Sequence, residues 1–326
     1  MKVCIYGAGA VGGYLGMAFA RAGCTLSAVA RGSTLAALRS DGLRLRSPDG
    51  SEHHTPVTAS DDPFQLGPQD LVILSVKTPA LPEVAQRIGA LLQANTMVLH
   101  AMNGLPWWFF ENAPAPWRGL TLASLPAQAA LAAAIPLARV LAAVVYVNCT
   151  RDAPGVTRHN SGTRVLLGEP AGGLSMRVSA VAARLRRGGV AAEASAAIRQ
   201  EVWKKLAANM PLNPISALTG ARTDQVIADT LIRNFTGALL AEAARIGEQL
   251  QLPETPQVGA VFDSLRPLGA TRTSMLQDLE AGRATELDAV LTVMRELGQH
   301  TGVSTPFIDA LLGLAQLQRA ARAAQA

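Results

Sequence analysis

Three glycines near the N-terminus have the spacing of a loop that binds phosphate groups. Gly7, Gly9 and Gly12 stand between an apolar, β-prone stretch, 2–6, and an alanine-rich helical pattern, 13–21. In this order the first glycine permits a tight turn, the second lets the backbone approach a pyrophosphate, and the third lets the helix pack on the strand. The unpaired N–H groups and positive end of the helix then face the anion. The sequence therefore predicts a dinucleotide site, and its loop residues are Gly7, Ala8, Gly9, Ala10, Val11 and Gly12.

The residue that follows the second predicted strand, 25–30, indicates which dinucleotide is bound. Sites for NAD place an acidic residue about 20 residues beyond the glycines, where it holds the ribose 2′-hydroxyl. This chain has Arg31 there, and the next carboxylate is Asp41. A guanidinium can bind a 2′-phosphate and stack on adenine, whereas a carboxylate would repel the phosphate. Arg31 is also consistent with a solvated arginine at a strand end, but we predict NADP(H) as the cofactor.

A second group of polar residues recurs at a spacing of four in the C-terminal half. Lys205, Asn209 and Asn213 fall on one face of a helix at this spacing. Asparagine is a poor residue in the middle of a helix, and a solvated stripe would favour Glu, Gln or Lys. The row is therefore predicted to face something specific. Pro211 and Pro214 are expected to kink or end this helix, which would move Asn213 out of the row.

Four further polar residues are candidates for a site, each with a plainer alternative. Lys77 and Asn103 follow predicted strands, at the sheet edge where nicotinamide and substrate would meet. Either one could instead be an ordinary loop or cap residue. Ser274 could cap the helix that follows it or bind a ligand. Glu286 could be a carboxylate stabilised by the dipole at the start of a long helix.

The elements that must position these residues divide the chain into two parts. Apolar strands alternate with helices in the N-terminal half, which predicts an α/β Rossmann-type doubly wound parallel sheet. From about residue 177 helix-forming residues dominate and no alternating strand pattern remains, so an all-α C-terminal domain is expected. Its long helices are predicted at 195–210, 223–251 and 280–302. We predict a NADP-binding domain over 1–190 and a helical substrate and catalytic domain over 191–326.

The composition favours an ordered enzyme with anionic ligands. The chain has 326 residues, 49% hydrophobic and 16% charged, with a net charge of +5. Its basic residues are scattered, which argues against nucleic acid and leaves cofactor phosphates or a carboxylate substrate as partners. The three cysteines and five histidines form no spaced cluster, so no metal site is expected. The uncharged stretch 119–138 has the length of a membrane span but is alanine-rich and interrupted by prolines. We predict packed chain there, no membrane association and a cytoplasmic protein.

An aromatic run, 107–110, follows Asn103 closely. Trp107, Trp108, Phe109 and Phe110 could pack in a core or form a contact between two copies of the chain. They could also form a hydrophobic wall over nicotinamide and substrate. The sequence leaves these alternatives open, together with the oligomeric state, for which a homodimer is one prediction.

Together, the ordered motifs resemble the ketopantoate reductase (2-dehydropantoate 2-reductase) family across nearly the whole chain. The matching segments are Gly7-x-Gly9-x-x-Gly12, Arg31, Val76-Lys77, Asn103-Gly104, Pro154-Gly155-Val156, Leu167-Gly168-Glu169, Trp203-Lys204-Lys205-Leu206-x-x-Asn209-x-x-x-Asn213-Pro214, Ser274-Met275-Leu276-Gln277-Asp278 and Thr285-Glu286-Leu287-Asp288. The resemblance implies NADPH-dependent reduction of a 2-keto acid, ketopantoate, to the 2-hydroxy acid pantoate in pantothenate biosynthesis.

The resemblance also implies a role for each matching residue. Lys205 would be the general acid, and Glu286 would orient it and set its charge. The substrate-binding residues implied are Asn103, Lys205, Asn209, Asn213 and Ser274. The cofactor-binding residues implied beyond the glycine loop are Arg31, Lys77, Asn103 and Glu286. The family often has an asparagine three residues before the serine, where this chain has Thr271, which leaves the identity of the keto acid open.

Two other functions are consistent with the same motifs. One is an NAD(P)-dependent 2-hydroxyacid dehydrogenase of the same family that acts on another 2-keto acid, with NADH as an alternative cofactor. The other is a non-catalytic NADP(H) sensor that kept the fold. A sensor predicts loss of the lysine or its partners, whereas Lys205, Asn209 and Glu286 are all present.

Overall fold

The computed structural model describes residues 1–125 and 127–324 and divides into two compact units. The N-terminal unit contains Met1–Met102, Pro106–Asn112 and 127–199. The C-terminal unit contains Asn103–Leu105, Ala113–Leu125 and 200–324. The main division falls after Arg199, and two short segments from the first half of the chain belong to the C-terminal unit. The pattern of helices and strands along the sequence does not indicate that these two segments belong to the C-terminal unit.

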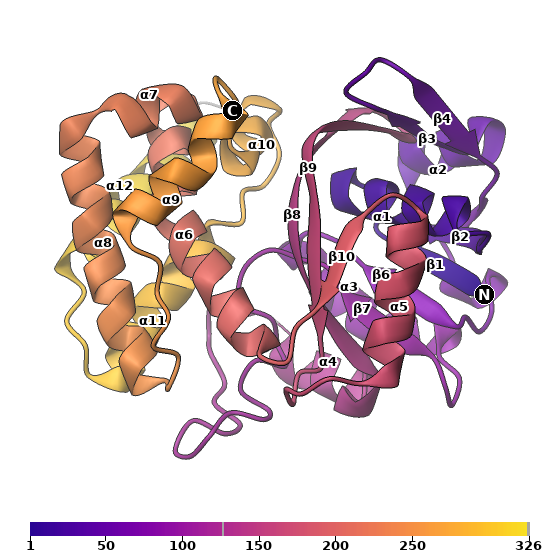
Figure 1. Cartoon of the computed structure of the whole chain (residues 1–326), viewed down its shortest axis with the longest axis horizontal. Coiled ribbons are helices and arrows are strands. Elements are labelled where there is room, and N and C mark those ends of the chain that lie inside the picture. The colour runs from indigo at the N-terminus through magenta and orange to yellow at the C-terminus, as the bar shows by residue number, and fades with distance from the viewer. Residues whose placement is uncertain (126, 325–326) are drawn as a thin grey trace. The chain divides into compact units, whose positions relative to one another are not determined.

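The N-terminal unit is built on a twisted sheet whose strands run mostly parallel (Figure 1). In the described residues the sheet order is β4-β3-β9-β8-β7-β6-β1-β2-β5, with β10 beside β9. The strands are β1 (Lys2–Tyr6), β2 (Thr25–Val29), β3 (Leu43–Arg46), β4 (Glu52–Thr55), β5 (Thr58–Ser60), β6 (Leu71–Leu74), β7 (Met97–His100), β8 (Val140–Ala153), β9 (Val156–Gly168) and β10 (Ala191–Ala194). The run from β5 to β8 is parallel throughout, while β3 with β4 and β8 with β9 form antiparallel pairs. The predicted Rossmann-type doubly wound sheet is confirmed.

One strand contradicts the prediction that strands end before residue 177. Ala191–Ala194 forms β10, which pairs in parallel with the end of β9. This segment, Ala-Ala-Glu-Ala, has none of the β-branched or aromatic residues that mark a strand in a sequence. Its extended backbone is set by pairing with a neighbouring strand, a tertiary effect that local sequence does not carry.

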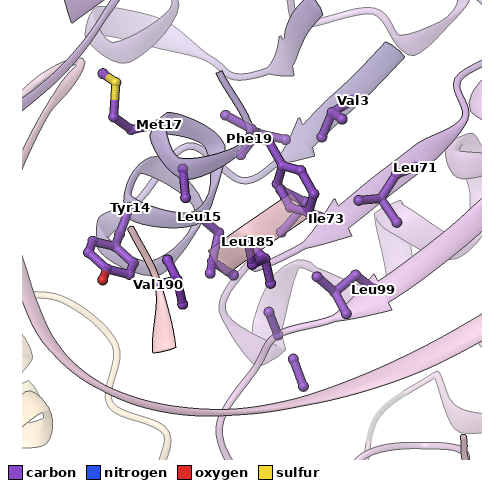
Figure 2. Packing of buried hydrophobic residues seen from close by; sticks show 14 of the residues in the cluster. Val3, Tyr14, Leu15, Met17, Phe19, Leu71, Ile73, Leu99, Leu185 and Val190 are labelled. Atoms are coloured by element: carbon purple, nitrogen blue, oxygen red, sulfur yellow. The ribbon is translucent and has the colours of Figure 1, made fainter. Parts of the chain in front are cut away.

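Helices flank this sheet and bury its apolar faces. The helices of the unit are α1 (Ala10–Arg21), α2 (Gly32–Asp41), α3 (Leu81–Arg87), α4 (Gln128–Ala134) and α5 (Met176–Arg187), with short 3₁₀ turns at Pro63–Gln65, Thr78–Ala80, Ile88–Leu91 and Leu137–Arg139. Figure 2 shows Leu15 and Phe19 of α1 packed among strand residues such as Ile73 of β6. A Cβ atom at Gly16 would lie 2.2 Å from the end of the Ile5 side chain, so any other residue there would require this side chain or α1 to shift.

The aromatic run lies in the core of this unit. The side chains of Trp107, Trp108, Phe109 and Phe110 are each at most 4% exposed. Both tryptophan rings lie edge-on to His100, with ring centroids 5.0 and 6.2 Å away, and burial lowers the pKa of His100 to about 3. The core-packing interpretation of the run is therefore supported over a contact between copies, which needs an exposed face.

Helices form the C-terminal unit, and its described residues include no strand. They are α6 (Ile198–Thr219), α7 (Thr223–Ala228), α8 (Thr230–Gln249), α9 (Val258–Leu265), α10 (Ser274–Glu280), α11 (Val293–Thr301) and α12 (Pro306–Ala323), with a 3₁₀ turn at Arg266–Leu268 and a π-helical turn, η6, at Asp288–Thr292 (Figure 1). The first two residues of α6 belong to the N-terminal unit. The predicted all-α character of the C-terminal part is confirmed.

Three helix boundaries differ from the sequence prediction. α6 does not end at Pro211 or Pro214 but continues to Thr219, with both prolines inside the helix. The helix expected over 223–251 is two helices, since Asp229 accepts a hydrogen bond from Ile232 N and caps a new start. The segment 281–286 is a loop, because α10 ends before Gly282, which has a φ of +64°.

Two buried or partly buried carboxylates bind backbone N–H groups in the C-terminal unit, one at a helix start and one in a loop. Glu242 of α8 accepts from the backbone N–H groups of Phe307 and Ile308, each at 2.9 Å, at the start of α12. Glu296 of α11 accepts from the backbone N–H groups of Ala123 and Ser124, at 2.6 and 2.9 Å. These bonds satisfy helix and loop N–H groups that would otherwise lack partners, and Glu296 ties the 113–125 segment to this unit.

Within the described part of the chain, no helix has both the length and the apolar character needed to cross a membrane. The cytoplasmic location and the homodimer stay predictions from the sequence.

Candidate functional site

Of the three glycines in the loop after β1, Gly7 and Gly12 are required by the fold of the loop, and Gly9 faces open space. Gly7 has a φ of +100°, and a Cβ atom there would lie 2.8 Å from the Val76 side chain. A Cβ atom at Gly12 would lie 2.3 Å from the Gly7 carbonyl oxygen and 2.4 Å from Ser75 Oγ. At Gly9, by contrast, no atom would lie within 4 Å. The loop is therefore held tightly from within and is open at its middle glycine.

The start of α1 is electrostatically suited to an anion. Gly9 is its N-cap residue, no side chain caps it, and its first turn has no acidic residue. β1 lies between β2 and β6, so this loop lies at the point where the strand order reverses, which is where open α/β sheets bind ligands. The exposed N–H groups and positive end of the helix fit a phosphate. These residues therefore fit the pyrophosphate of a dinucleotide.

Arg31 has an acidic partner that the sequence analysis missed. It follows β2 as the N-cap residue of α2, and its side chain is 61% exposed. Its Nη2 atom lies 2.6 Å from Oε2 of Glu83, in the first turn of α3, and Glu83 also lies 3.6 Å from Arg87. Glu83 is 52 residues away from Arg31 in sequence, so no local pattern indicates the pair.

The ion pair between Arg31 and Glu83 bears on cofactor choice. Exposed ion pairs contribute only about 0.2–1 kcal/mol, so Arg31 can exchange its carboxylate partner for a ligand phosphate at little cost in stability. Glu83 nevertheless places a negative charge where a 2′-phosphate would bind Arg31, and this charge disfavours NADP(H) relative to NAD(H). Lys77, the third cofactor candidate on this sheet, is exposed and follows the strand β6 at the N-cap position of the Thr78–Ala80 turn.

In the C-terminal unit Lys205 meets Asn103. Nζ of Lys205 donates a hydrogen bond to Oδ1 of Asn103 at 2.8 Å, across 102 residues of sequence. Burial lowers the pKa of Lys205 from 10.5 to about 8, and the negative charge of Glu286 acts in the opposite direction. Three residues predicted from separate motifs are thus grouped around one ammonium group. A lysine that titrates near neutral pH is suited to proton transfer.

The asparagine row survives in the folded chain. Because α6 runs unbroken from Ile198 to Thr219, Asn209 and Asn213 keep the four-residue spacing that begins at Lys205. All three side chains are partly buried. The face therefore offers an ammonium group and two amides along about two helical turns.

Ser274 does not cap α10. It is the exposed first residue of the helix, and the cap is Thr273, whose Oγ1 accepts from Leu276 N. That leaves ligand binding as the remaining prediction for Ser274. Thr271 has its hydroxyl 3.1 Å from Thr223 Oγ1, so this side chain is bound to the start of α7.

The predicted site residues thus fall into two groups. In the N-terminal unit are Gly7, Ala8, Gly9, Ala10, Val11, Gly12, Arg31 and Lys77. In the C-terminal unit are Asn103, Lys205, Asn209, Asn213, Ser274 and Glu286. Among the described residues, no group of three or more His, Cys, Asp or Glu side chains could hold a metal ion.

Comparisons with known proteins agree with this organisation. The model of the ketopantoate reductase PanE/ApbA family matches residues 3–114, and that of the ketopantoate reductase PanE/ApbA C-terminal region matches residues 197–319. A 2-dehydropantoate 2-reductase of Mesorhizobium japonicum is 41% identical over 315 residues, which cover 96% of each chain. A crystal structure from Ralstonia solanacearum MolK2, provisionally assigned as a ketopantoate reductase, is 47% identical, with a TM-score of 0.92 over 98% of each chain.

A more distant structure shares the fold alone. It is the ternary structure of a D-mandelate dehydrogenase with NADH and anilino(oxo)acetate. It is 20% identical, with a TM-score of 0.83 over 98% of this chain and 99% of its own.

The geometry of the glycine loop predicts different effects for two alanine substitutions. Gly9→Ala should fold like the wild type, because its methyl group meets no protein atom, but should bind NADPH or NADH at least about tenfold more weakly, since the methyl group occupies space that the ligand needs. Gly12→Ala should lower the free energy of unfolding by about 1–3 kcal/mol, because its methyl group overlaps the Gly7 carbonyl. Urea denaturation and fluorescence titration measure the two effects. Wild-type affinity in Gly9→Ala would contradict the assignment.

Proposed function

Because this chain belongs to the ketopantoate reductase family, we propose that it reduces 2-dehydropantoate to pantoate with NADPH and that Lys205 is the general acid. The observation that carries the proposal is the Lys205 ammonium group, partly buried, bonded to Asn103 and with a pKa of about 8. The family makes the chain an oxidoreductase that acts on a small keto acid. The choice of NADPH rests on Arg31 at the end of β2.

The chemistry requires one proton donor beside the keto oxygen. When bound, the nicotinamide supplies a hydride to the keto carbon of the substrate. As the carbonyl electron pair moves onto oxygen, Lys205 stabilises the negative charge and transfers its proton to form the hydroxyl group. The neutral amine then regains a proton from solvent. Such a proton transfer contributes about 10²–10⁴-fold to the rate.

The neighbours of Lys205 have complementary roles in this proposal. Asn103 accepts a hydrogen bond from the ammonium group and so fixes its direction. Glu286 favours the protonated form through its negative charge and offsets part of the effect of burial. Asn209, Asn213 and Ser274 supply amide and hydroxyl groups for the carboxylate and hydroxyl of the acid.

The loop residues from Gly7 to Gly12 hold the cofactor pyrophosphate in this proposal. Arg31 binds the 2′-phosphate, and Lys77 lies by the cofactor at the end of β6. Support comes from the open Gly9 position and from the start of α1, which has no acidic residue in its first turn.

Initial rates of NADPH oxidation across a panel of 2-keto acids test the function. We expect the highest kcat/KM for ketopantoate, with kcat about 10²–10⁴-fold lower in Lys205→Ala because the proton donor is lost. Lys204→Ala is the matched control, since the Lys204 ammonium is ion-paired with Glu201 and Glu254 instead of Asn103. Its kcat should stay within about twofold of the wild type, as for a surface substitution.

Other outcomes of this panel identify the alternatives. A preference for another acid would favour the 2-hydroxyacid dehydrogenase. The structural argument for this alternative is that Thr271, at a position of expected substrate contact, has its hydroxyl bonded to that of Thr223. NADPH binding without turnover on any acid would favour the sensor. Equal losses in Lys205→Ala and Lys204→Ala would refute Lys205 as the general acid.

The pH dependence of keto-acid reduction should follow the ionisation of Lys205. Reduction needs the protonated amine, so kcat/KM for the keto acid should be constant below a pKa of about 8 and fall about tenfold per pH unit above it. Glu286→Gln removes the negative charge that favours protonation, and the falling limb should move to lower pH. Steady-state profiles from pH 6 to 10 measure both. A limb that does not move in Glu286→Gln would exclude Glu286 from setting the charge of Lys205.

Because Arg31 and Glu83 form an ion pair, we expect substitutions of the two residues to change cofactor preference in opposite directions. Arg31→Ala should lower kcat/KM for NADPH about 10–100-fold, the effect of losing a charged hydrogen bond of about 1.5–3 kcal/mol, with little change for NADH. Glu83→Gln should raise kcat/KM for NADPH relative to NADH, because it removes the carboxylate that competes with the 2′-phosphate. Parallel titrations with both cofactors measure the ratio. Equal losses with both cofactors in Arg31→Ala would argue against binding of the 2′-phosphate.

A further inference from the structure

The tripeptide Asn103–Leu105 approaches η6 through a residue without a side chain. Gly104 has a φ of +84°, and a Cβ atom there would lie 2.8 Å from both the Cβ atom and the carbonyl oxygen of Ala289. The next residue, Leu105, donates its backbone N–H to the same carbonyl oxygen at 3.4 Å. The tripeptide therefore packs on Ala289 through the bare α-carbon of Gly104.

The surface that receives Gly104 is itself well fixed. Ala289 is buried in the π-helical turn Asp288–Thr292, three residues after Glu286. Asp288, at the start of the turn, accepts a hydrogen bond from Thr292 Oγ1 at 2.8 Å and pairs with Arg319 of α12 at 3.1 Å. π-Helical turns are rare and frequently occur at functional sites. The contact surface at Ala289 is thus part of the buried core of this unit, with Glu286 close to it in sequence.

We infer that Gly104 is a positioning residue for the proposed reduction, since its close contact with Ala289 holds the Asn103 amide against the Lys205 ammonium group. The inference rests on the proposed role of Lys205. In this inference the contact between Gly104 and Ala289 holds the segments that carry Asn103 and Glu286 at fixed positions around Lys205.

The distances show why a single methyl group would disturb this arrangement. Ordinary contact for a Cβ atom begins at 3.4 Å, so a methyl group at 2.8 Å has to retreat by about 0.6 Å or more. Asn103 is the adjacent residue and shares the backbone that would move. Its hydrogen bond to Lys205 is 2.8 Å long, and a shift of that size away from Nζ takes it beyond the range of good N–H···O geometry.

Backbone strain alone is the competing explanation, and the chain offers a matched control. Gly119 lies in the same unit with a φ of +75°, and a Cβ atom there would meet no atom within 4 Å. Gly119→Ala therefore introduces a similar backbone strain without the contact. Ala289→Val is the second test, because it enlarges the same contact from the other side while residue 104 stays a glycine, so no side chain is added at its positive φ.

Steady-state kinetics on the full chain give the first readout. We expect Gly104→Ala to lower kcat for keto-acid reduction about 100-fold, the effect of misplacing a reacting group by about 1 Å, with KM for NADPH within about threefold. Ala289→Val should change kcat in the same direction, and Gly119→Ala should leave kcat within about twofold. The double variant Asn103→Ala/Gly104→Ala should be no slower than Asn103→Ala, because both substitutions act through the same amide. Thermal unfolding identifies any variant that fails to fold.

A second readout does not depend on turnover. Trace labelling of the Lys205 amine with acetic anhydride across pH, followed by peptide mass spectrometry, gives its ionisation profile in each variant. The midpoint should lie near pH 8 in the wild type and move to lower pH in Gly104→Ala and Asn103→Ala, because the charged form loses an acceptor. It should stay unchanged in Gly119→Ala. If the wild type reduces no keto acid, the proposed function fails while this profile still tests the position of Lys205.

Two results would overturn the inference. One is a Gly104→Ala variant whose kcat and labelling profile match those of Gly119→Ala. The other is a double variant whose loss equals the product of the two single losses, which would mean that Gly104 acts independently of Asn103.

Discussion

An ammonium group held partly out of water is the constraint around which the C-terminal unit is organised. Burial disfavours the charged form of Lys205, so that form persists near neutral pH only if polar partners replace part of its hydration. Among its partners are a neutral acceptor, Asn103, and a negative charge, Glu286. More negative charge around Lys205 would raise its pKa, whereas wholly apolar surroundings would lower the pKa until the amine is neutral. The observed set leaves the lysine able to give up a proton and to regain it.

Close backbone approach is the second constraint, and glycine meets it in both units. In the N-terminal unit Gly12 brings the start of α1 against the loop after β1, and Gly188 brings the end of α5 against the carbonyl oxygen of Ala18. In the C-terminal unit Gly104 brings Asn103 against η6. Each contact leaves too little space for a methyl group, so each brings two backbone segments closer than any other residue would allow without a shift. Such contacts let short loops hold functional groups without long side chains as spacers.

Features that depend on local sequence could be predicted, and those that depend on distant pairing could not. The spacing of the glycines and the helical periodicity from Lys205 to Asn213 are local, so the loop after β1 and the polar face of α6 followed directly from the chain. β10 was missed because its alanines adopt a strand only beside β9. Glu83 was missed because only the folded sheet brings it to Arg31. The bond between Asn103 and Lys205 likewise joins residues far apart in sequence, and only the family resemblance had grouped them.

The ion pair at the edge of the sheet also has an evolutionary consequence. The Arg31 side chain is well exposed and the Glu83 side chain partly exposed, and neither is part of the buried core, so either can change with little effect on folding. Lys205 and Gly12 have no such freedom, because burial or close packing ties them to the rest of the structure. With the roles proposed for Arg31 and Lys205, mutational drift at this surface changes which nicotinamide cofactor a lineage uses while its proton donor stays the same. Electron supply and acid catalysis would then evolve at different rates within one protein.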